Sequence, residues 1–410
     1  MRAPTIIDSP SAVRRVNRAR VLDLIRLDGP LTRPQVVRRS GLSKATVREV
    51  CDDLLADGLL AQERAAADVP RGPGRPAARL RYRGAHGHVL GLDIGADKVL
   101  ALVADLAGTV VAGHRAGLPA DRRPAAAQVL AAADEAVRRA LGAAGVERSS
   151  VRAAVAGTPG VVAPRTGVIS LAPQIAGWEG LELAHELQAR LRLPARVENE
   201  VQLAVVGERW RGAAHDLDAA VYLQLGIGIA AGIVVRGELV RGAAGGAGEI
   251  GYLPVPGAGA PPAGIGPFEW VAGGHAFARA GQAAARAAGG SALLARAGGD
   301  PAAIDARVVC SAAADGDPAA VRIVDELAGR LAHGVAALAC VLNPAVIVVG
   351  GGLSHAGALL LGPLREHVER RVPLPPRLVV SELGEQAVAV GAVRLALEAA
   401  HAALDLSLDP

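Results

Sequence analysis

The residues best suited to chemistry in this chain are Glu198, Asn199 and Glu200, where a strand-like run passes directly into a helical pattern. Side chains at the carboxyl end of a strand face the crevice in which open α/β sheets bind ligands. A carboxylate there could take the proton of a substrate hydroxyl while Asn199 fixes the position of that hydroxyl. The structural alternative is that Asn199 and Glu200 cap and begin a surface helix. The rest of the chain has to decide between these interpretations.

Composition limits the architecture. The chain has 410 residues, too many for one ordinary core, which predicts two or three domains. Residues 1–83 carry 17 Lys and Arg against 9 Asp and Glu, whereas the remaining residues carry 27 against 31. A basic head on a mildly acidic body indicates a nucleic-acid-binding module joined to a different module.

The cysteines and the N-terminus indicate a cellular compartment. Cys51, Cys310 and Cys340 are isolated and odd in number, which predicts neither a disulfide framework nor a cysteine metal site and fits a reducing environment. Charged residues stand where a signal peptide needs an apolar core, and no charge-free apolar run reaches membrane-spanning length. We therefore expect a soluble cytoplasmic protein without a membrane partner.

The head begins with two helical patterns. The apolar spacing of residues 11–30 predicts a helix with Val13 and Val16 on its buried stripe. A second helix is expected after Thr32, because Gln35 completes the spacing of a capping box.

A third helix is expected over Lys44–Ala56, capped by Ser43, after a tight turn in which Gly41 takes a positive φ. This is the pattern of a helix-turn-helix, in which the later helix lies in the major groove. The expected DNA contacts of these helices are Thr32, Ser43, Lys44, Ala45, Thr46 and Arg48.

A probable wing follows and leads into a basic, Pro- and Gly-rich stretch over residues 71–83. We expect Arg71 and Arg75 to contact DNA, since an extended Gly-Arg-Pro segment is narrow enough for a minor groove. The alternative is a basic linker at the end of the first domain, and the two readings are compatible.

Two glycine-interrupted strand pairs organise the body. Residues 88–113 read as two strands around a turn, with Asp93 at the end of the first strand, and residues 221–242 repeat the plan. The repetition indicates two related lobes. Helices are also expected over residues 124–141, 181–191, 321–342 and 387–403, and strands over 151–155 and 345–354.

Taken as an ordered set, these motifs resemble the ROK family of repressors, open reading frames and sugar kinases. The matching segments are the winged head, LDIGADK at 92–98, GTPGVV at 157–162, VENE at 197–200, LGIGIAAG at 225–232, AGEIGY at 247–252, Phe268-Glu269 and NPAVIVVGGGLS at 343–354. The resemblance covers nearly the whole chain. It implies an α/β fold in which an N-terminal winged helix-turn-helix precedes a two-lobed sugar-kinase/actin-like (ribonuclease H-like) ROK domain.

The resemblance also implies domain boundaries. Residues 1–83 would form the DNA-binding head with its basic wing or linker, residues 84–200 with the C-terminal helix 387–410 would form lobe I, and residues 201–386 would form lobe II. Family members with such a head resemble xylose and N-acetylglucosamine repressors, whereas members without it are kinases.

Several positions depart from the family's kinases. Glu200 stands where they have the aspartate that deprotonates the sugar, and a displacement near 1 Å can cost about a hundredfold in rate. Asp97 replaces a threonine of the first phosphate hairpin, so its charge should repel ATP. In the second hairpin Ile227 replaces a threonine, and Ala230 and Ala231 replace glycines that allow close phosphate approach.

The family's zinc site is also missing from the sequence. Tyr252 occupies the position of its histidine, and residues 253–268 contain neither Cys nor His. We expect no metal, no cofactor and no kinase activity, with Glu200 as the vestige of a catalytic base. By resemblance, a surviving sugar pocket would use Asn199, Glu200, Glu249, Tyr252 and Glu269, although Glu249 and Glu269 could instead only satisfy loop backbone amides.

These observations predict a transcriptional regulator of the repressor type that binds double-stranded operator DNA as a homodimer and responds to a sugar or sugar derivative. One alternative is an ATP-dependent sugar kinase carrying an added DNA-binding head. Another is a DNA-binding regulator that needs no ligand.

Overall fold

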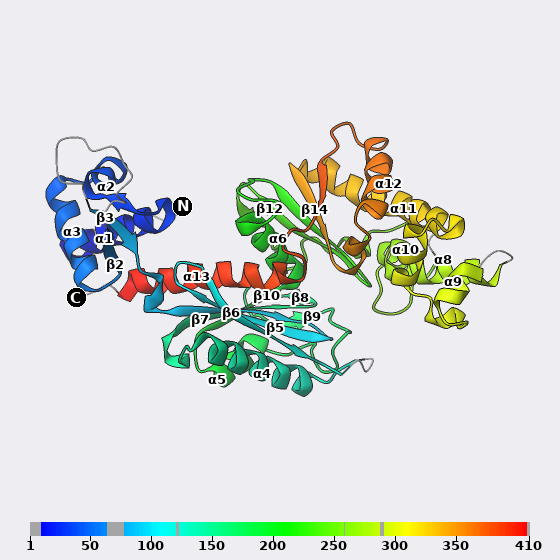
Figure 1. Ribbon diagram of the computed structural model, residues 1–410, viewed down its shortest axis with the longest axis horizontal. Coiled ribbons are helices and arrows are strands. Elements are labelled where there is room, and N and C mark those ends of the chain that lie inside the picture. Colours follow the sequence, from blue (N-terminus) through cyan, green and yellow to red (C-terminus); the bar gives the residue numbers. More distant parts are fainter. Residues whose placement is uncertain (1–9, 64–77, 120–122, 258, 288–290, 408–410) are drawn as a thin grey trace.

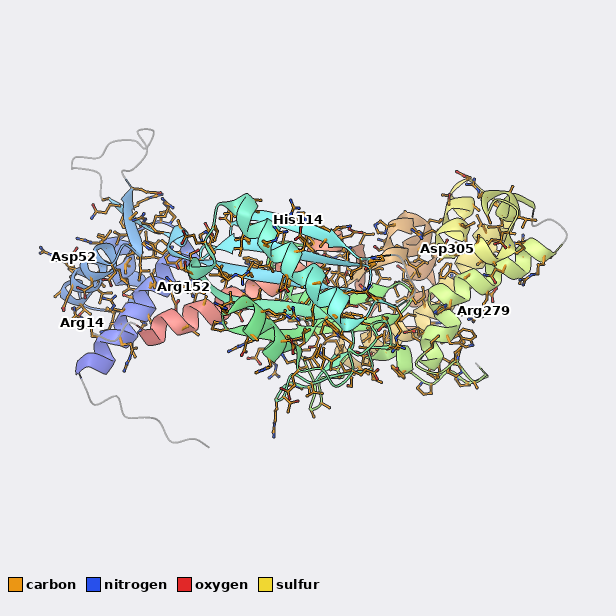
Figure 2. The ribbon with its side chains drawn as sticks, turned by 90° about the horizontal axis from the view of Figure 1, so that it is seen from below. Arg14, Asp52, His114, Arg152, Arg279 and Asp305 are labelled. Atoms are coloured by element: carbon orange, nitrogen blue, oxygen red, sulfur yellow. The ribbon has the colours of Figure 1, made fainter. Side chains whose placement is uncertain are left out.

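The computed structural model describes residues 10–63, 78–119, 123–257, 259–287 and 291–407 (Figure 1). The molecule is elongated: the view in Figure 2 places Arg14 and Asp52 toward one end and Arg279 and Asp305 toward the other. The basic head occupies the first end, and two sheets with their covering helices form the rest. In the described ranges, no helix combines the length and apolarity needed to cross a membrane.

The head contains three helices and a small antiparallel sheet of strand order β1-β3-β2. Its elements are α1 (Pro10–Asp28), β1 (Leu31–Thr32), α2 (Arg33–Ser40), α3 (Lys44–Ala56), β2 (Leu60–Glu63) and β3 (Arg79–Tyr82). The predicted start signals are confirmed: Gln35 Oε1 accepts a hydrogen bond from the Thr32 backbone N–H at 2.8 Å, and the Ser43 hydroxyl accepts one from the Thr46 N–H at 3.1 Å. Gly41 ends α2 with a φ of 69°, as its place in the turn required.

One expectation about the head is wrong, and the linker alternative for the basic stretch does not hold for residues 79–82. Val13 and Val16 are 47% and 48% exposed, because the apolar burial of α1 begins only at Val21 and the first turns extend past the core. Residues 79–82 are not linker but the central strand of the head sheet, with Leu80 and Tyr82 buried. The basic stretch therefore ends in a strand that the head needs in order to fold.

The body contains two five-stranded sheets with the same connectivity. In each, three antiparallel strands form a meander and two further strands add in parallel beside the first, which confirms the predicted repeat. The first sheet, of order β10-β7-β4-β5-β6, comprises β4 (His88–Ile94), β5 (Lys98–Asp105), β6 (Val110–Gly117), β7 (Val151–Thr158) and β10 (Ala195–Asn199). The second, of order β13-β12-β11-β14-β15, comprises β11 (Ala220–Leu225), β12 (Ile229–Val235), β13 (Glu238–Leu239), β14 (Val346–Gly350) and β15 (Arg377–Val380).

Helices cover both sheets. One face of the first sheet packs on α4 (Ala126–Ala144) and α5 (Leu183–Leu191), and the other on α13 (Ala387–Ser407). The second sheet packs on α6 (Glu200–Arg211) on one face, while its other face shares a core with α8, α11 and α12. The remaining described helices are α7 (Pro267–Ala272), α8 (Gly274–Arg286), α9 (Ser291–Arg296), α10 (Ala306–Ala314), α11 (Pro318–Leu342) and α12 (Ala358–Glu369).

The predicted body elements are present, and most differ only at their ends. The strand expected over 345–354 stops at Gly350, since Gly351 takes a φ of 81° and a short 3-10 helix (Gly352–Ala356) follows. The last helix extends to Ser407 and, as Figure 1 shows, runs from the middle of the molecule to the head. The domain boundaries inferred from the sequence stay predictions.

Candidate functional site

The outward face of α3 displays the residues expected to meet DNA. Lys44, Ala45 and Arg48 are exposed and Thr46 is half-buried, while Val47 and Val50 of the same helix are buried in the head core. Arg48 is the most projecting of these side chains, at 80% exposed, with its Nε 3.9 Å from Asp52. A helix that buries one face and presents Lys and Arg on the other has the geometry of a groove-reading element.

Acidic side chains on α3 would repel a phosphate backbone, but arginines of the neighbouring helices engage them. Arg14 of α1 lies 2.6 Å from Asp53 and 3.8 Å from Glu49, and Arg33 of α2 pairs with Asp52. These contacts neutralise the acidic part of the helix. Among the described residues, Lys44 makes no ion pair, so its charge is available to a partner.

The hydroxyl groups of Thr32 and Ser43 already make hydrogen bonds within the head. The Thr32 hydroxyl donates to Gln35 at 2.9 Å, and the Ser43 hydroxyl both caps α3 and lies 2.9 Å from the Thr46 hydroxyl. A DNA contact by Ser43 would therefore compete with its capping role. Arg71 and Arg75 lie outside the described residues.

In the body, Asn199 caps the helix α6, as the structural alternative to a catalytic role predicted. Its Oδ1 accepts from the backbone N–H groups of Val201 and Gln202 at 2.9 and 3.1 Å, and its Nδ2 donates to Gly160 O at 2.8 Å. The helix that it caps is not a surface helix, however, because α6 is largely buried between the two sheets. With both oxygen lone pairs used, only one N–H of the Asn199 amide remains for a ligand.

Glu200 and Asp93 form the electrostatic centre of the site. Burial, with the nearby Asp93 carboxylate, raises the pKa of Glu200 to about 8. Burial likewise raises the pKa of Asp93 to about 7, against the opposing effect of Lys98. Asp93 is only 8% exposed, and within the described part of the chain neither carboxylate makes a hydrogen bond. Two carboxylates with raised pKa values and no hydrogen bond to a described residue are acceptors that a polyhydroxy ligand could use.

The remaining ionisable residues expected to bind the ligand interact electrostatically with Glu200 or with one another. The charge of Glu249 helps to raise the pKa of Glu200. Burial raises the pKa values of Glu249 and Tyr252, and the charge of Glu269 raises both further. The fold thus brings the four ionisable residues of the expected set, Glu200, Glu249, Tyr252 and Glu269, into one electrostatic neighbourhood, with Asn199 next to Glu200 in the chain. Tyr252 is 43% exposed.

Glu269 and Glu249 differ in their hydrogen bonds to the protein. Glu269 Oε2 accepts from the Ile229 N–H at 3.2 Å, as the backbone-amide alternative proposed, whereas the Glu249 carboxylate makes no hydrogen bond to any described residue. Glu249 is therefore the freer of the two. No group of three or more His, Cys, Asp or Glu side chains in the described ranges is arranged to hold a metal ion.

A cross-lobe ion pair, which sequence reasoning missed, holds the segment that carries Glu249. Arg241 Nε lies 3.0 Å from both Glu198 oxygens, and its second nitrogen lies 2.7 Å from Oε1. Gln202 adds a bond from its amide to Gly245 O at 3.0 Å. Glu198 is the last residue but one of β10 while Arg241 follows β13, so this ion pair ties the segment after the second sheet's last hairpin to the end of β10. No local signal could reveal a pair separated by 43 residues.

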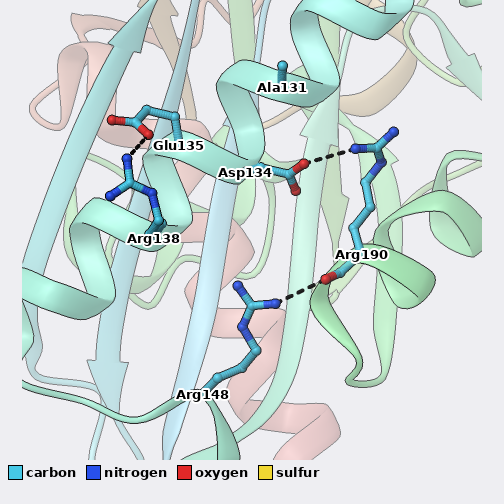
Figure 3. A pocket seen from close by; sticks show the side chains of 6 residues that line it. All are labelled: Ala131, Asp134, Glu135, Arg138, Arg148 and Arg190. Carbon is cyan, nitrogen blue, oxygen red and sulfur yellow. Dashed lines mark hydrogen bonds and ion pairs between the residues drawn. The ribbon is translucent and has the colours of Figure 1, made fainter.

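A hollow on the outer surface of lobe I is a different feature (Figure 3). It measures about 410 Å³ and is lined by residues of α4, α5 and the short Arg148–Ser150 helix. Its charges satisfy one another: Arg190 lies 2.9 Å from Asp134, Arg138 pairs with Glu135, and Arg148 donates to the Arg190 carbonyl at 3.0 Å. None of the expected ligand residues lines it.

Comparison with known proteins identifies the family. The model of the ROK family matches residues 89–399. The chain belongs to the ROK family. The match begins at β4, so the head lies outside it.

Two relatives illustrate the two classes within the ROK family. A putative xylose repressor of Caldicellulosiruptor sp. (strain Rt8B.4) is 25% identical over 395 residues, which cover 94% of this chain and 96% of that protein. A glucokinase of Halalkalibacterium halodurans is 31% identical over 309 residues, which cover 74% of this chain and 92% of that protein.

Solved structures divide in the same way. A ROK family transcriptional regulator, described as a homologue of the E. coli MLC protein, is 25% identical with a TM-score of 0.74 and covers 96% of this chain and 98% of its own. A ROK family glucokinase from Streptomyces griseus, solved with glucose and AMPPNP, is 32% identical with a TM-score of 0.66 and covers 76% of this chain and 100% of its own. The regulators match nearly the whole chain, and the kinases about three quarters of it.

Proposed function

We propose that this ROK protein is a transcriptional regulator whose head is a winged helix-turn-helix that binds operator DNA. One observation carries the proposal: the chain adds to the ROK body a head in which α3 exposes Lys44 and Arg48 while neighbouring arginines neutralise its acids. The xylose repressor and the MLC homologue, which match nearly the whole chain, support this reading.

The proposed ligand is a sugar or sugar derivative at Asn199, Glu200, Glu249, Tyr252 and Glu269. The unpartnered carboxylates of Glu200 and Glu249 support this placement, since fixed oxygen acceptors suit a ligand with many hydroxyl groups. A homodimer fits the proposal because two recognition helices must reach successive half-sites. Ligand binding would then alter DNA affinity if it favours one arrangement of the lobes.

The test is a mobility-shift titration on DNA from upstream of the gene, at physiological salt, with and without D-xylose and D-glucose. Salt must be controlled because a basic head binds any duplex weakly. We expect Arg48→Ala to weaken specific binding about 10- to 100-fold, the worth of one good base contact. Arg307→Ala is the matched control, since that arginine is 90% exposed on lobe II. Equal affinity in Arg48→Ala and the control would remove α3 from the DNA surface.

A sugar kinase is the second candidate, favoured by the glucokinase relatives and by Glu200, which burial makes a stronger proton acceptor than an ordinary carboxylate. Against it stand Asp97 and Ile227 at the two hairpin tips. Sugar-dependent release of ADP that disappears in Glu200→Gln would establish the kinase. Specific DNA binding that no sugar alters would instead support a ligand-independent regulator.

A further inference from the structure

The last helix, α13, touches both the candidate ligand site and the head. Glu385 lies in the short 3-10 helix (Gly384–Gln386) that leads directly into α13. Its carboxylate lies 3.2 Å from Lys98 Nζ and also pairs with Arg115. These two cations hold the pKa of Glu385 below its usual range. The start of α13 is thus tied to both β5 and β6.

Lys98 faces two sets of carboxylates at once. It is the first residue of β5, immediately after the hairpin tip that follows Asp93. Besides pairing with Glu385, it opposes the rise in pKa of both Asp93 and Glu200. Its side chain is 19% exposed, so solvent screens these interactions only in part. Any ligand group that meets Asp93 or Glu200 therefore changes the forces on Lys98.

Glycines allow the first half of α13 to pack directly against backbone. A Cβ at Gly391 would lie 1.9 Å from Leu203 O of α6, and one at Gly207 of α6 would lie 2.3 Å from Ala387 O. A Cβ at Gly91 of β4 would lie 2.4 Å from Ala389 O. With no side chains between them, α13, α6 and β4 cannot slide past one another independently.

The far end of α13 is built into the head. His401 Nε2 lies 3.0 Å from Leu106 O, and its ring stands edge-on to Tyr82 of β3, with centroids 6.1 Å apart. His401 is buried, and burial beside Arg26 of α1 lowers its pKa to about 4. The head and this face of lobe I form one continuous apolar cluster. Figure 1 shows the helix spanning the distance between the two regions.

We propose that α13 couples the ligand site to the DNA-binding head and that Glu385 is the positioning residue at its input end. A ligand that binds Glu200 shifts Lys98, the Lys98–Glu385 contact passes the shift to the start of α13, and the helix carries it to Tyr82 and α1. The inference rests on the proposed function, since it requires both DNA binding and a ligand.

The experiment separates coupling from binding. Operator affinity is measured with and without saturating D-xylose or D-glucose, and sugar affinity is measured calorimetrically, for wild type and Glu385→Gln. We expect Glu385→Gln to keep both individual affinities within about twofold, while the ratio of operator affinities without and with sugar falls about fivefold or more. Glu385→Asp, which retains the charge, should restore part of the ratio.

Glu398→Gln is the matched control, because Glu398 lies on the same helix and forms its ion pair with Arg394, at 3.1 Å, rather than with Lys98 or Arg115. Hydrogen exchange of the α13 and β3 amides gives a second readout: sugar should alter it in wild type and not in Glu385→Gln. A full sugar response in Glu385→Gln overturns the coupling role and leaves the proposed function intact. A wild type that binds its operator but ignores both sugars, with no exchange difference, overturns the ligand half of the proposed function together with this inference.

Discussion

The two body sheets have the same strand order, yet their hairpin tips have opposite chemistry. The β4–β5 tip is charged: Asp93 is buried before it, Asp97 is exposed on it, and Lys98 follows. The β11–β12 tip is apolar, with Ile227 73% exposed between two glycines. The two sheets share one topology, and they differ in the charge and polarity of their hairpin tips.

The two tips also satisfy their polar groups differently. At the second tip Glu269 accepts a hydrogen bond from Ile229 N–H, whereas at the first tip Asp93 has no hydrogen-bond partner among the described residues. The first sheet also packs along much of α13, the helix that reaches the head, whereas the second sheet contacts α13 at its first residues, Ala387 and Val388, and through α6. The comparison teaches that the first sheet carries the charged hairpin tip and most of the contact with the helix that reaches the head.

The largest expected effect comes from breaking the crossing that joins the two sheets. Gly391→Ala places a methyl group 1.9 Å from Leu203 O, so backbone must move, at a cost of about 3 kcal/mol in free energy of unfolding. The control is Gly142→Ala in α4, where a Cβ would meet nothing within 4 Å. That change should stabilise by about 0.5–1 kcal/mol, because alanine favours helix over glycine. Denaturant melts measure the free energy of unfolding of both variants. Equal values would show that α13 and α6 can move apart at their crossing without loss of stability.

A smaller effect should distinguish the two glutamates of lobe II. Glu269→Ala removes the acceptor of the Ile229 N–H and should cost about 1–2 kcal/mol in free energy of unfolding. Glu249→Ala removes a half-buried carboxylate with no hydrogen bond to a described residue, so stability should stay the same or rise. Thermal melts at pH 7 measure both. Similar losses in the two variants would mean that Glu249 also has a structural partner.

The last effect is the pH dependence that the buried carboxyl group of Glu200 gives to stability. The folded pKa of Glu200, about 8, lies above its usual value of 4.5, so the folded state holds this proton to higher pH than the unfolded state does. Its contribution to stability is complete below about pH 4.5 and is lost as the pH rises toward 8. Glu200→Gln should therefore gain stability over wild type as the pH rises from 5 to 8, by more than about 1 kcal/mol, because each unit of the pKa shift is worth about 1.4 kcal/mol. A difference that does not depend on pH would refute the buried-carboxylate interpretation.

Local sequence predicted the head elements and the two hairpins well, because caps, turn glycines and apolar spacing act over a few residues. Ser43 and Gly41 are examples, since each works within its own turn. Prediction failed where burial depends on a distant segment: Val13 has the correct helical spacing but no described residue covers it, and Leu80 is a core residue in a stretch that could be read as a linker. The ligand residues came from the family resemblance, and their roles stay predictions.

The sequence by itself determined the strand–turn–strand units, the basic head and the ordered motifs of a ROK protein, because each depends on residues close together in the chain. Only the tertiary structure decided which charges meet. Arg241 reaches Glu198 across 43 residues, and Arg115 reaches Glu385 across 270. Electrostatic energies depend on distance and burial rather than on separation along the chain. Asp93 and Glu200 therefore come near each other only because β4 and β10 flank β7 in the first sheet, and α13 reaches the head only because it packs along that sheet.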